Sequence, residues 1–335
     1  MAKIVGGGYP ALTGGSAQGD DVMVIVDVHD TTEDATGSTK TITLTQLETA
    51  LNALATANWI GTFGDGSDGA VTLDGTTTFN SFSSLAGSTY TLTRDVFATS
   101  LTVNNTVILQ PAGYRIFCTG AFSNAGTVSY PGANASGATR GAGIAQGSFA
   151  NGGPGVTGVT GVGAAPSSNA GSVAVGAGGA GGSGTSGAGG AAVSPNITST
   201  FPFRLPHAVL AGVTQGKFNS GATAPAGAFG GSSGAGDGTT AGGGGGSGGG
   251  VIAILAHSAV NTGTITVAGG NGGTPSGGNC GGGGGGGGGL IVAYTLTAWS
   301  AGTTTVTGGT GGGHTGTGVS GSAGGTGNVL NVVLA

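Results

Sequence analysis

The hydrophobic segment VIAIL at residues 251–255 returns as LIVAY at residues 290–294 and as VLNVV at residues 329–333, each time 39 residues further along the chain. Between these segments, GTITV at 263–267 returns as GTTTV at 302–306, and the glycines that follow return at the same spacing. The segments are rich in β-branched residues, which favour strands. A period shared by strands and glycine runs predicts a repeat architecture over residues 251–335, in which each repeat buries a face that its neighbour supplies.

The same pattern begins earlier in the chain. The stretch NAGTVS at 124–129 matches NTGTIT at 261–266, and a hydrophobic segment precedes each by a similar distance. We therefore interpret residues 131–250 as one long glycine-rich excursion inserted between successive rungs of strands. Residues 269–289 and 308–328 are predicted to be shorter excursions of the same kind.

The amino-acid composition limits the classes of protein to which the chain can belong. The 335 residues include 82 glycines and 10 prolines, but only 7 Lys or Arg and 12 Asp or Glu. Disordered chains usually carry much more charge, so an ordered structure is favoured. A net charge of −5 gives no electrostatic footprint for nucleic acid. Neither a signal peptide nor a run long enough to span a membrane is visible, so we expect a soluble protein made in a cytoplasm.

Nine consecutive glycines occupy residues 281–289. They are either a flexible linker or polyglycine helices of the polyproline II type, with three residues per turn. In such a helix the amides point outward, and only glycine lets neighbouring helices approach closely enough to bond them. Because the excursions leave and re-enter at a fixed register, we favour an ordered bundle of antiparallel helices. Gly281, Gly285 and Gly289 are the candidate packing positions.

The N-terminal region has a more ordinary pattern. Residues 1–19 are interpreted as a flexible segment, and residues 20–60 as a module of two strands (22–26 and 40–44) followed by a helix. Thr45 and Glu48 form a capping box at the start of that helix. The helix is too short to be stable alone, so it must pack on its own strands, on sister chains or on a larger particle. The candidate residues of this attachment or oligomer seam are Val24, Val26, Leu47, Leu51 and Leu54.

Two further regions complete the predicted organisation. Residues 61–130 contain short Thr- and Val-rich segments separated by turn residues, which predicts a β-domain built as a sandwich or as stacked rungs. Residues 194–218 form an island of aromatic, proline and basic residues within the glycine-rich excursion. The island is either a recognition surface or a hydrophobic plug or inter-chain contact. Its candidate receptor contacts are Phe201, Phe203, Arg204 and His207.

No constellation for catalysis is found. Chance G-x-G-x-x-G matches lack a strand–helix context, and no phosphate-binding loop with a lysine occurs. After Asp95 the sequence has only one carboxylate, Asp237, so a pair for glycoside cleavage is missing there. The four histidines are far apart, and Cys118 and Cys280 are expected to be reduced thiols. We expect a protein that is not an enzyme and that needs no metal or cofactor.

The N-terminal residues carry a resemblance. The segments DDVMVIVD (20–27), DTT (30–32), GSTK (37–40) and ITLTQL (42–47) resemble the N-terminal attachment module of phage tail fibres and related virion surface proteins. The glycine-rich remainder is similar to distal tail-fibre adhesins, whose polyglycine helices form a sandwich with receptor-binding loops at its end. The resemblance implies that residues 20–58 dock on the virion and that the distal loops contact the host.

Together these features favour a mainly β, homotrimeric fibre or adhesin subunit located in the virion. Its expected partners are itself, other virion proteins through the N-terminus, and a glycan or outer protein of a bacterial surface, with no nucleic acid and no membrane insertion. One alternative is a capsid-decorating head fibre. A second is an ice-binding protein or other non-viral surface protein, because Thr-rich strands and polyglycine bundles can both present flat surfaces. The acidic, attachment-like N-terminus argues against that second alternative.

Overall fold

The chain divides into two compact units, Met1–Gly61 and Thr62–Ala335. The structure, a computed structural model, describes residues 62–143, 152–166, 176–193, 228–300 and 302–334, together with the backbone of residues 22–27 and 38–43. These described residues are mainly β-structure and contain no helix. In the first unit, β1 (Val22–Asp27) pairs with β2 (Ser38–Thr43) in an antiparallel hairpin, as the two predicted strands require. The predicted helix that follows lies outside the described residues.

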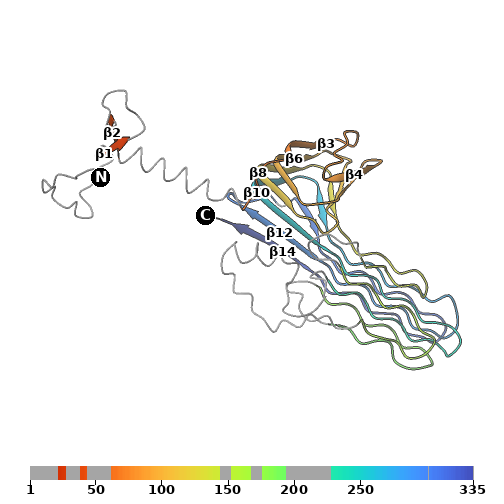
Figure 1. The fold of residues 1–335 in the computed structure, drawn as a ribbon. Helices are drawn as coiled ribbons and strands as arrows, with labels where there is room; N and C mark the ends of the chain where they lie inside the picture. The colour runs from red at the N-terminus through yellow and green to blue at the C-terminus, as the bar shows by residue number, and fades with distance from the viewer. Residues whose placement is uncertain are drawn as a thin grey trace, which may run out of the picture. The chain divides into compact units, whose positions relative to one another are not determined.

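The second unit contains two six-stranded sheets, and from β6 onward the chain alternates between them (Figure 1). We call the sheet with the longer strands the long sheet and the other the short sheet. In spatial order, the long sheet comprises β14 (Asn328–Val333), β12 (Leu290–Thr295), β10 (Val251–Asn261), β8 (Ile116–Asn124), β6 (Val96–Val103) and β3 (Gly69–Leu73). The short sheet comprises β13 (Thr303–Thr305), β11 (Thr264–Thr266), β9 (Thr127–Ser129), β7 (Ile108–Gln110), β5 (Thr89–Leu92) and β4 (Ser83–Ala86).

Neighbouring strands run parallel throughout both sheets, apart from β4, which is antiparallel to β5. Of the two arrangements left open by the sequence, the strands therefore form stacked rungs. Asn124 pairs with Asn261, and Thr127 pairs with Thr264, which is the match predicted from the sequence. Residues 131–250 consequently leave and re-enter the stack between two adjacent rungs.

The register of the last strand differs from the predicted one. Val251 pairs with Leu290, 39 residues away, but Leu290 pairs with Asn328 rather than with Val329, so the last offset is 38. The offset changes from 39 to 38 where the glycine-rich segments turn back. Thr274 still contacts Gly313 at an offset of 39 before the turn, whereas after it Asn279 contacts Thr317 at an offset of 38. The later turn is thus one residue shorter, and the strand that follows it is displaced by one residue.

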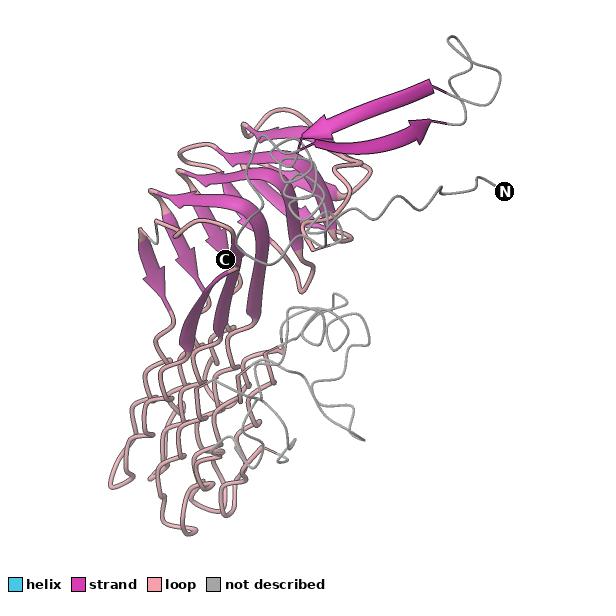
Figure 2. Ribbon diagram, turned by 90° about the vertical axis from the view of Figure 1, so that its left-hand side faces the viewer, coloured by secondary structure: helices cyan, strands magenta, loops and turns pink. Residues whose placement is uncertain are grey.

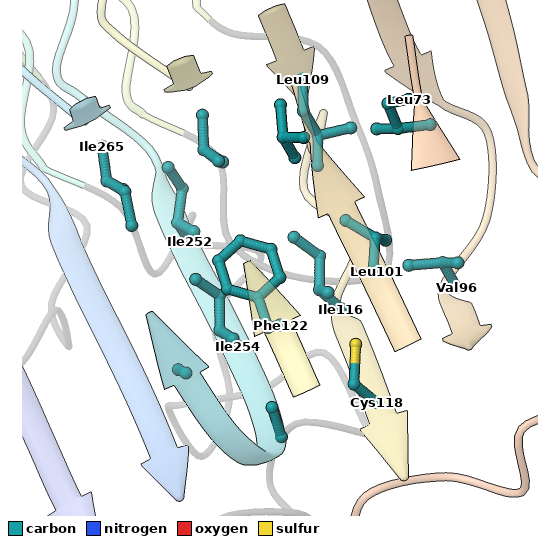
Figure 3. Close-up of a cluster of buried hydrophobic side chains, with 14 of the residues drawn as sticks. Leu73, Val96, Leu101, Leu109, Ile116, Cys118, Phe122, Ile252, Ile254 and Ile265 are labelled. Carbon is teal, nitrogen blue, oxygen red and sulfur yellow. The ribbon is translucent and has the colours of Figure 1, made fainter. Parts of the chain in front are cut away.

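A hydrophobic core fills the space between the two sheets (Figure 3). Alternate residues of the long sheet point into it, among them Ile116, Ile252 and Ile254, and the short sheet contributes Leu109 and Ile265. Along β12 every residue is buried, so both of its faces are covered, as is typical of parallel sheets. Burial in this core stabilises the strands. It cannot stabilise the glycine-rich segments in the same way, because they contain few side chains.

Candidate functional site: the tip of the glycine bundle

Glycine-rich segments extend from the ends of β9, β11 and β13 and return to β10, β12 and β14 (Figure 2). Their backbone groups bond mainly to the backbones of neighbouring segments, not to their own. We call this assembly the glycine bundle. Its described parts are residues 131–143, 152–166, 176–193, 228–250, 267–289 and 306–327.

The run of nine glycines at 281–289 lies at the centre of the bundle, and all nine N–H groups are paired. The first, fourth and seventh glycines donate to residues 229–235 at 2.8–2.9 Å. The second, fifth and eighth donate to residues 319–325 at 2.9–3.0 Å, and the third, sixth and ninth to residues 267–273 at 2.8–3.0 Å. The hydrogen-bond partners therefore repeat every three residues.

The carbonyl groups of the same run bond to three other segments. The first, fourth and seventh accept from residues 243–249, the second, fifth and eighth from residues 176–182, and the third and sixth from residues 309–312. The run thus has six neighbouring segments. Two of them, 243–249 and 319–325, run parallel to it, because their partner numbers rise along the run. The predicted bundle was antiparallel throughout, and the structure corrects this to a mixture of directions.

The neighbours of the run leave no room for side chains. A Cβ atom at Gly281, Gly285 or Gly289 would overlap a backbone carbonyl oxygen of an adjacent segment. In the outer segment 318–327, a Cβ atom would overlap the run at every third residue, and those residues are glycines such as Gly321 and Gly324. The positions between them include valine, serine and alanine. The glycine content of a segment therefore follows how many neighbours enclose it.

The segments turn back in loops at the far end of the bundle. We call residues 160–162, 184–187, 237–240, 274–279 and 313–317 the tip loops. In one of them, Asp237 Oδ1 accepts hydrogen bonds from the backbone N–H groups of Thr239 at 3.0 Å and Thr240 at 2.7 Å. These bonds, with that of Thr240 contributing most, hold the pKa of Asp237 well below its usual range. Asp237 shapes a turn and is not a free acid.

Hydrogen bonds join the tip loops into one surface. The backbone carbonyl of Asn279 accepts from Thr185 N at 3.1 Å, and its side-chain Oδ1 accepts from Thr317 N at 3.0 Å. The N–H of Asn279 donates to Asp237 Oδ2 at 3.2 Å. Gly238 N in turn donates to the carbonyl of Thr160 at 2.8 Å. All five loops are therefore positioned by one another as well as by the bundle beneath them.

The side chains of the tip loops are chiefly hydroxyls and amides. The loops contain one carboxylate and one imidazole, those of Asp237 and His314, and no lysine or arginine. Thr185 and Thr317 are exposed, and Val162 is 61% exposed. Such a surface can donate and accept hydrogen bonds and make small apolar contacts, but it offers little charge to a ligand.

A second regular surface lies on the outer face of the short sheet. Along β9, β11 and β13, one column contains Thr127, Thr264 and Thr303, and the next contains Ser129, Thr266 and Thr305. Strand β7 interrupts the array with Ile108 and Gln110, and beyond it β5 contributes Thr89 and Thr91. Adjacent strands are about 4.8 Å apart, and alternate residues of one strand about 6.6 Å apart. We call this array of hydroxyl and methyl groups the threonine face.

The structure places only some of the predicted site residues. The predicted receptor contacts in residues 201–207 lie outside the described residues, as do the leucines of residues 47–54. Val24 and Val26 are paired in β1 with Thr41 and Thr39. The tip loops were not among the predicted site residues. A signal was present, because Asp237-Gly238-Thr239-Thr240 is a turn sequence in the middle of an uncharged glycine region.

Among the described residues, no group of three or more His, Cys, Asp or Glu side chains could hold a metal ion. No helix in these ranges is long and apolar enough to cross a membrane. Comparison of the chain with protein-family models, with curated proteins and with solved structures finds no match.

Proposed function

We propose that this chain is a non-enzymatic structural protein of a bacteriophage virion, a tail-fibre or adhesin subunit whose N-terminus joins the particle and whose tip contacts the host. The observation that carries the proposal is the set of five tip loops, cross-linked by hydrogen bonds at the end of a bundle with a closely packed backbone. Recognition residues commonly lie on loops held by a rigid scaffold. The N-terminal resemblance supplies the attachment part of the proposal.

The three-residue repeat of partners around residues 281–289 supports a polyglycine II interpretation, because that helix has three residues per turn. Ordering a glycine costs about 1–2 kcal/mol of backbone entropy, which the paired amides offset. Polyglycine helices packed in this way form a stiff arm. A stiff arm holds its loops in a fixed arrangement, which lowers the entropy cost of binding.

The hydroxyl-rich, weakly charged tip suits a neutral glycan better than a strongly charged ligand. Residues 201–207, with Arg204 and His207, remain a second candidate contact. We further propose that the subunits assemble as a homotrimer through the N-terminal seam, and that the protein needs no cofactor.

Immunogold labelling of purified particles tests the location. Gold at the distal ends of tail fibres supports the proposal, and gold over the capsid identifies a head fibre instead. Particles without label would contradict a virion protein of either kind.

An adsorption assay tests the tip. The purified chain should compete with phage for host cells. Val162→Arg should weaken that competition, whereas Ala121→Arg, at an exposed position of β8, should not. If Arg204→Ala abolishes competition while Val162→Arg leaves it intact, the receptor contact belongs to residues 201–207 and not to the tip loops.

The threonine face favours a second candidate function, binding to ice. Across β9, β11 and β13 its columns present hydroxyl and methyl groups at regular spacings in two directions, as a surface that orders water would require. A thermal-hysteresis measurement tests this function. A clear positive that Thr266→Lys abolishes would support it, and freezing behaviour equal to that of buffer would exclude it.

A further inference from the structure

Strand β14 is the last strand of the long sheet, so one of its edges has no strand beside it in the described sheet. Its residues alternate in exposure, and Val329 and Val333 are 37% and 44% exposed. Both valines lie on the core side of the sheet, because Val329 pairs with the inward-facing Ile291. Among the residues that the structure describes, no strand pairs with this edge, and exposed apolar side chains lie along it.

An edge of this kind is ordinarily protected. Natural sheets blunt their edges with charged residues, bulges or short strands, and repeat proteins end in polar capping repeats. Strand β14 itself contains no Asp, Glu, Lys or Arg. An uncharged, apolar edge strand readily pairs with another strand.

The opposite edge of the long sheet is different. Strand β3 lies between Asp68 and Asp74, its pairing is interrupted by a register shift at Gly69, and Arg94 forms an ion pair with Asp68. In the short sheet, the antiparallel strand β4 closes the same end. This end is protected, so stacking of β14 on β3 of a second copy is disfavoured.

Residues 329–333 of β14 are self-complementary about Asn331. When two copies of NVLNVV (328–333) are laid antiparallel with Asn331 opposite itself, Val329 lies opposite Val333, and Leu330 lies opposite Val332. Residues opposite one another in an antiparallel pair share a face, so apolar meets apolar on both faces. The two Asn331 amides can hydrogen-bond to each other.

From this complementarity we propose that two copies of the chain associate through β14, paired antiparallel across a twofold axis at Asn331. The contact would continue the long sheet from one copy into the other and cover the exposed valines. It is an isologous contact and therefore closed, so it yields a dimer of subunits and not a filament. The proposal does not depend on what the tip loops bind.

Cysteine cross-linking of the full chain tests the axis. Opposite residues of an antiparallel pair have Cα atoms about 4.5–5.5 Å apart, within the range that a disulfide spans. Asn331→Cys should therefore form a disulfide-linked dimer under mild oxidation with diamide. Thr72→Cys, exposed on β3, is the matched control and should stay monomeric on a non-reducing gel. The native Cys118 and Cys280 are buried, and burial raises the pKa of Cys118 to about 12, so neither competes.

The cross-linking result can overturn the proposal. Absence of the Asn331→Cys dimer would do so.

The native mass of the full chain provides an independent test. Val333→Lys places a charge beside its partner's apolar residues and should halve the mass measured by light scattering, for example from dimer to monomer or from hexamer to trimer. Thr72→Lys should leave the mass unchanged. The twofold contact would be contradicted if the parent chain, the Val333→Lys variant and the Thr72→Lys variant all had the same native mass, whether that of a trimer or that of a monomer.

Discussion

The side-chain amide of Asn124 donates to Oδ1 of Asn261 at 2.7 Å, although 136 residues of chain lie between them. Both side chains are almost fully buried, and Asn261 in turn donates to the carbonyl of Thr303 at 3.4 Å. The two asparagines thus link three successive rungs at the point where the chain passes from the long sheet to the short one. The link therefore joins neighbouring rungs at this corner.

Removing that link should destabilise the stack. Asn124→Leu would remove this hydrogen bond from the buried Oδ1 of Asn261, and one such hydrogen bond contributes about 0.5–1.5 kcal/mol. We expect the free energy of unfolding in urea to fall by that amount. Asn104→Ala, at an exposed position just after β6, is the control and should change it by less than about 0.5 kcal/mol. Equal effects of the two substitutions would mean that the amide link contributes nothing to stability.

Substitution at Gly285 should lower the melting temperature, and valine should lower it more than alanine. A Cβ atom there would overlap the carbonyl of Gly309, separate two segments and break several amide hydrogen bonds. Each amide left unpaired costs about 1–3 kcal/mol. Thermal unfolding followed by circular dichroism measures the effect.

The matched control is Gly277→Ala in a tip loop, where an added Cβ meets nothing within 4 Å. This change should be neutral or slightly stabilising, because alanine restricts the unfolded chain. A parent-like melting temperature for both Gly285 variants would contradict a packed bundle and favour a flexible linker.

Acid should weaken the tip through Asp237. Because hydrogen bonds from Thr240 and Thr239 lower the pKa of Asp237 in the folded state, its contribution is complete above the unfolded pKa and is lost as pH falls through the folded one. At pH 7, Asp237→Ala should melt at a lower temperature than the parent chain. The difference should shrink as the pH falls below about 4. A difference in melting temperature that stays constant down to pH 2 would show that the charge of the carboxylate does not contribute to stability.

The N-terminal seam predicts a defect in assembly. Leu51→Asp should prevent incorporation of the chain into particles, because it places a charge in the predicted apolar stripe of Leu47, Leu51 and Leu54. Immunoblots of purified particles measure incorporation. Asn52→Asp, off the stripe, is the control, and normal incorporation of the Leu51 variant would contradict the seam.

The sequence predicted the rungs more accurately than the register of the last rung. Local repetition located β10, β12 and β14, because buried strands must keep apolar residues in phase with their neighbours. It did not show the shift from Val329 to Asn328, because that shift originates in a turn of polar residues, where length is under little constraint. The contact by which Asp237 joins two tip loops was not predictable from local sequence. The partner residue, Asn279, is 42 residues away and is brought near by the bundle.

The direction of the glycine segments was also only partly predictable. Excursions that leave and return imply antiparallel neighbours within each pair. Contacts between pairs, such as that of residues 281–289 with 243–249, depend on how the pairs are laid side by side. Glycine sequences carry no side-chain pattern from which this arrangement could be read.

The two parts of the second unit respond differently to temperature. Unfolding the sheets exposes apolar side chains, which raises the heat capacity and makes their stabilisation weaken on cooling. Unfolding residues 281–289 exposes peptide groups almost alone, and polar surface lowers the heat capacity. The bundle therefore has an interior of peptide groups and not of hydrocarbon. Cooling should not weaken its stabilisation as it weakens that of a hydrophobic core.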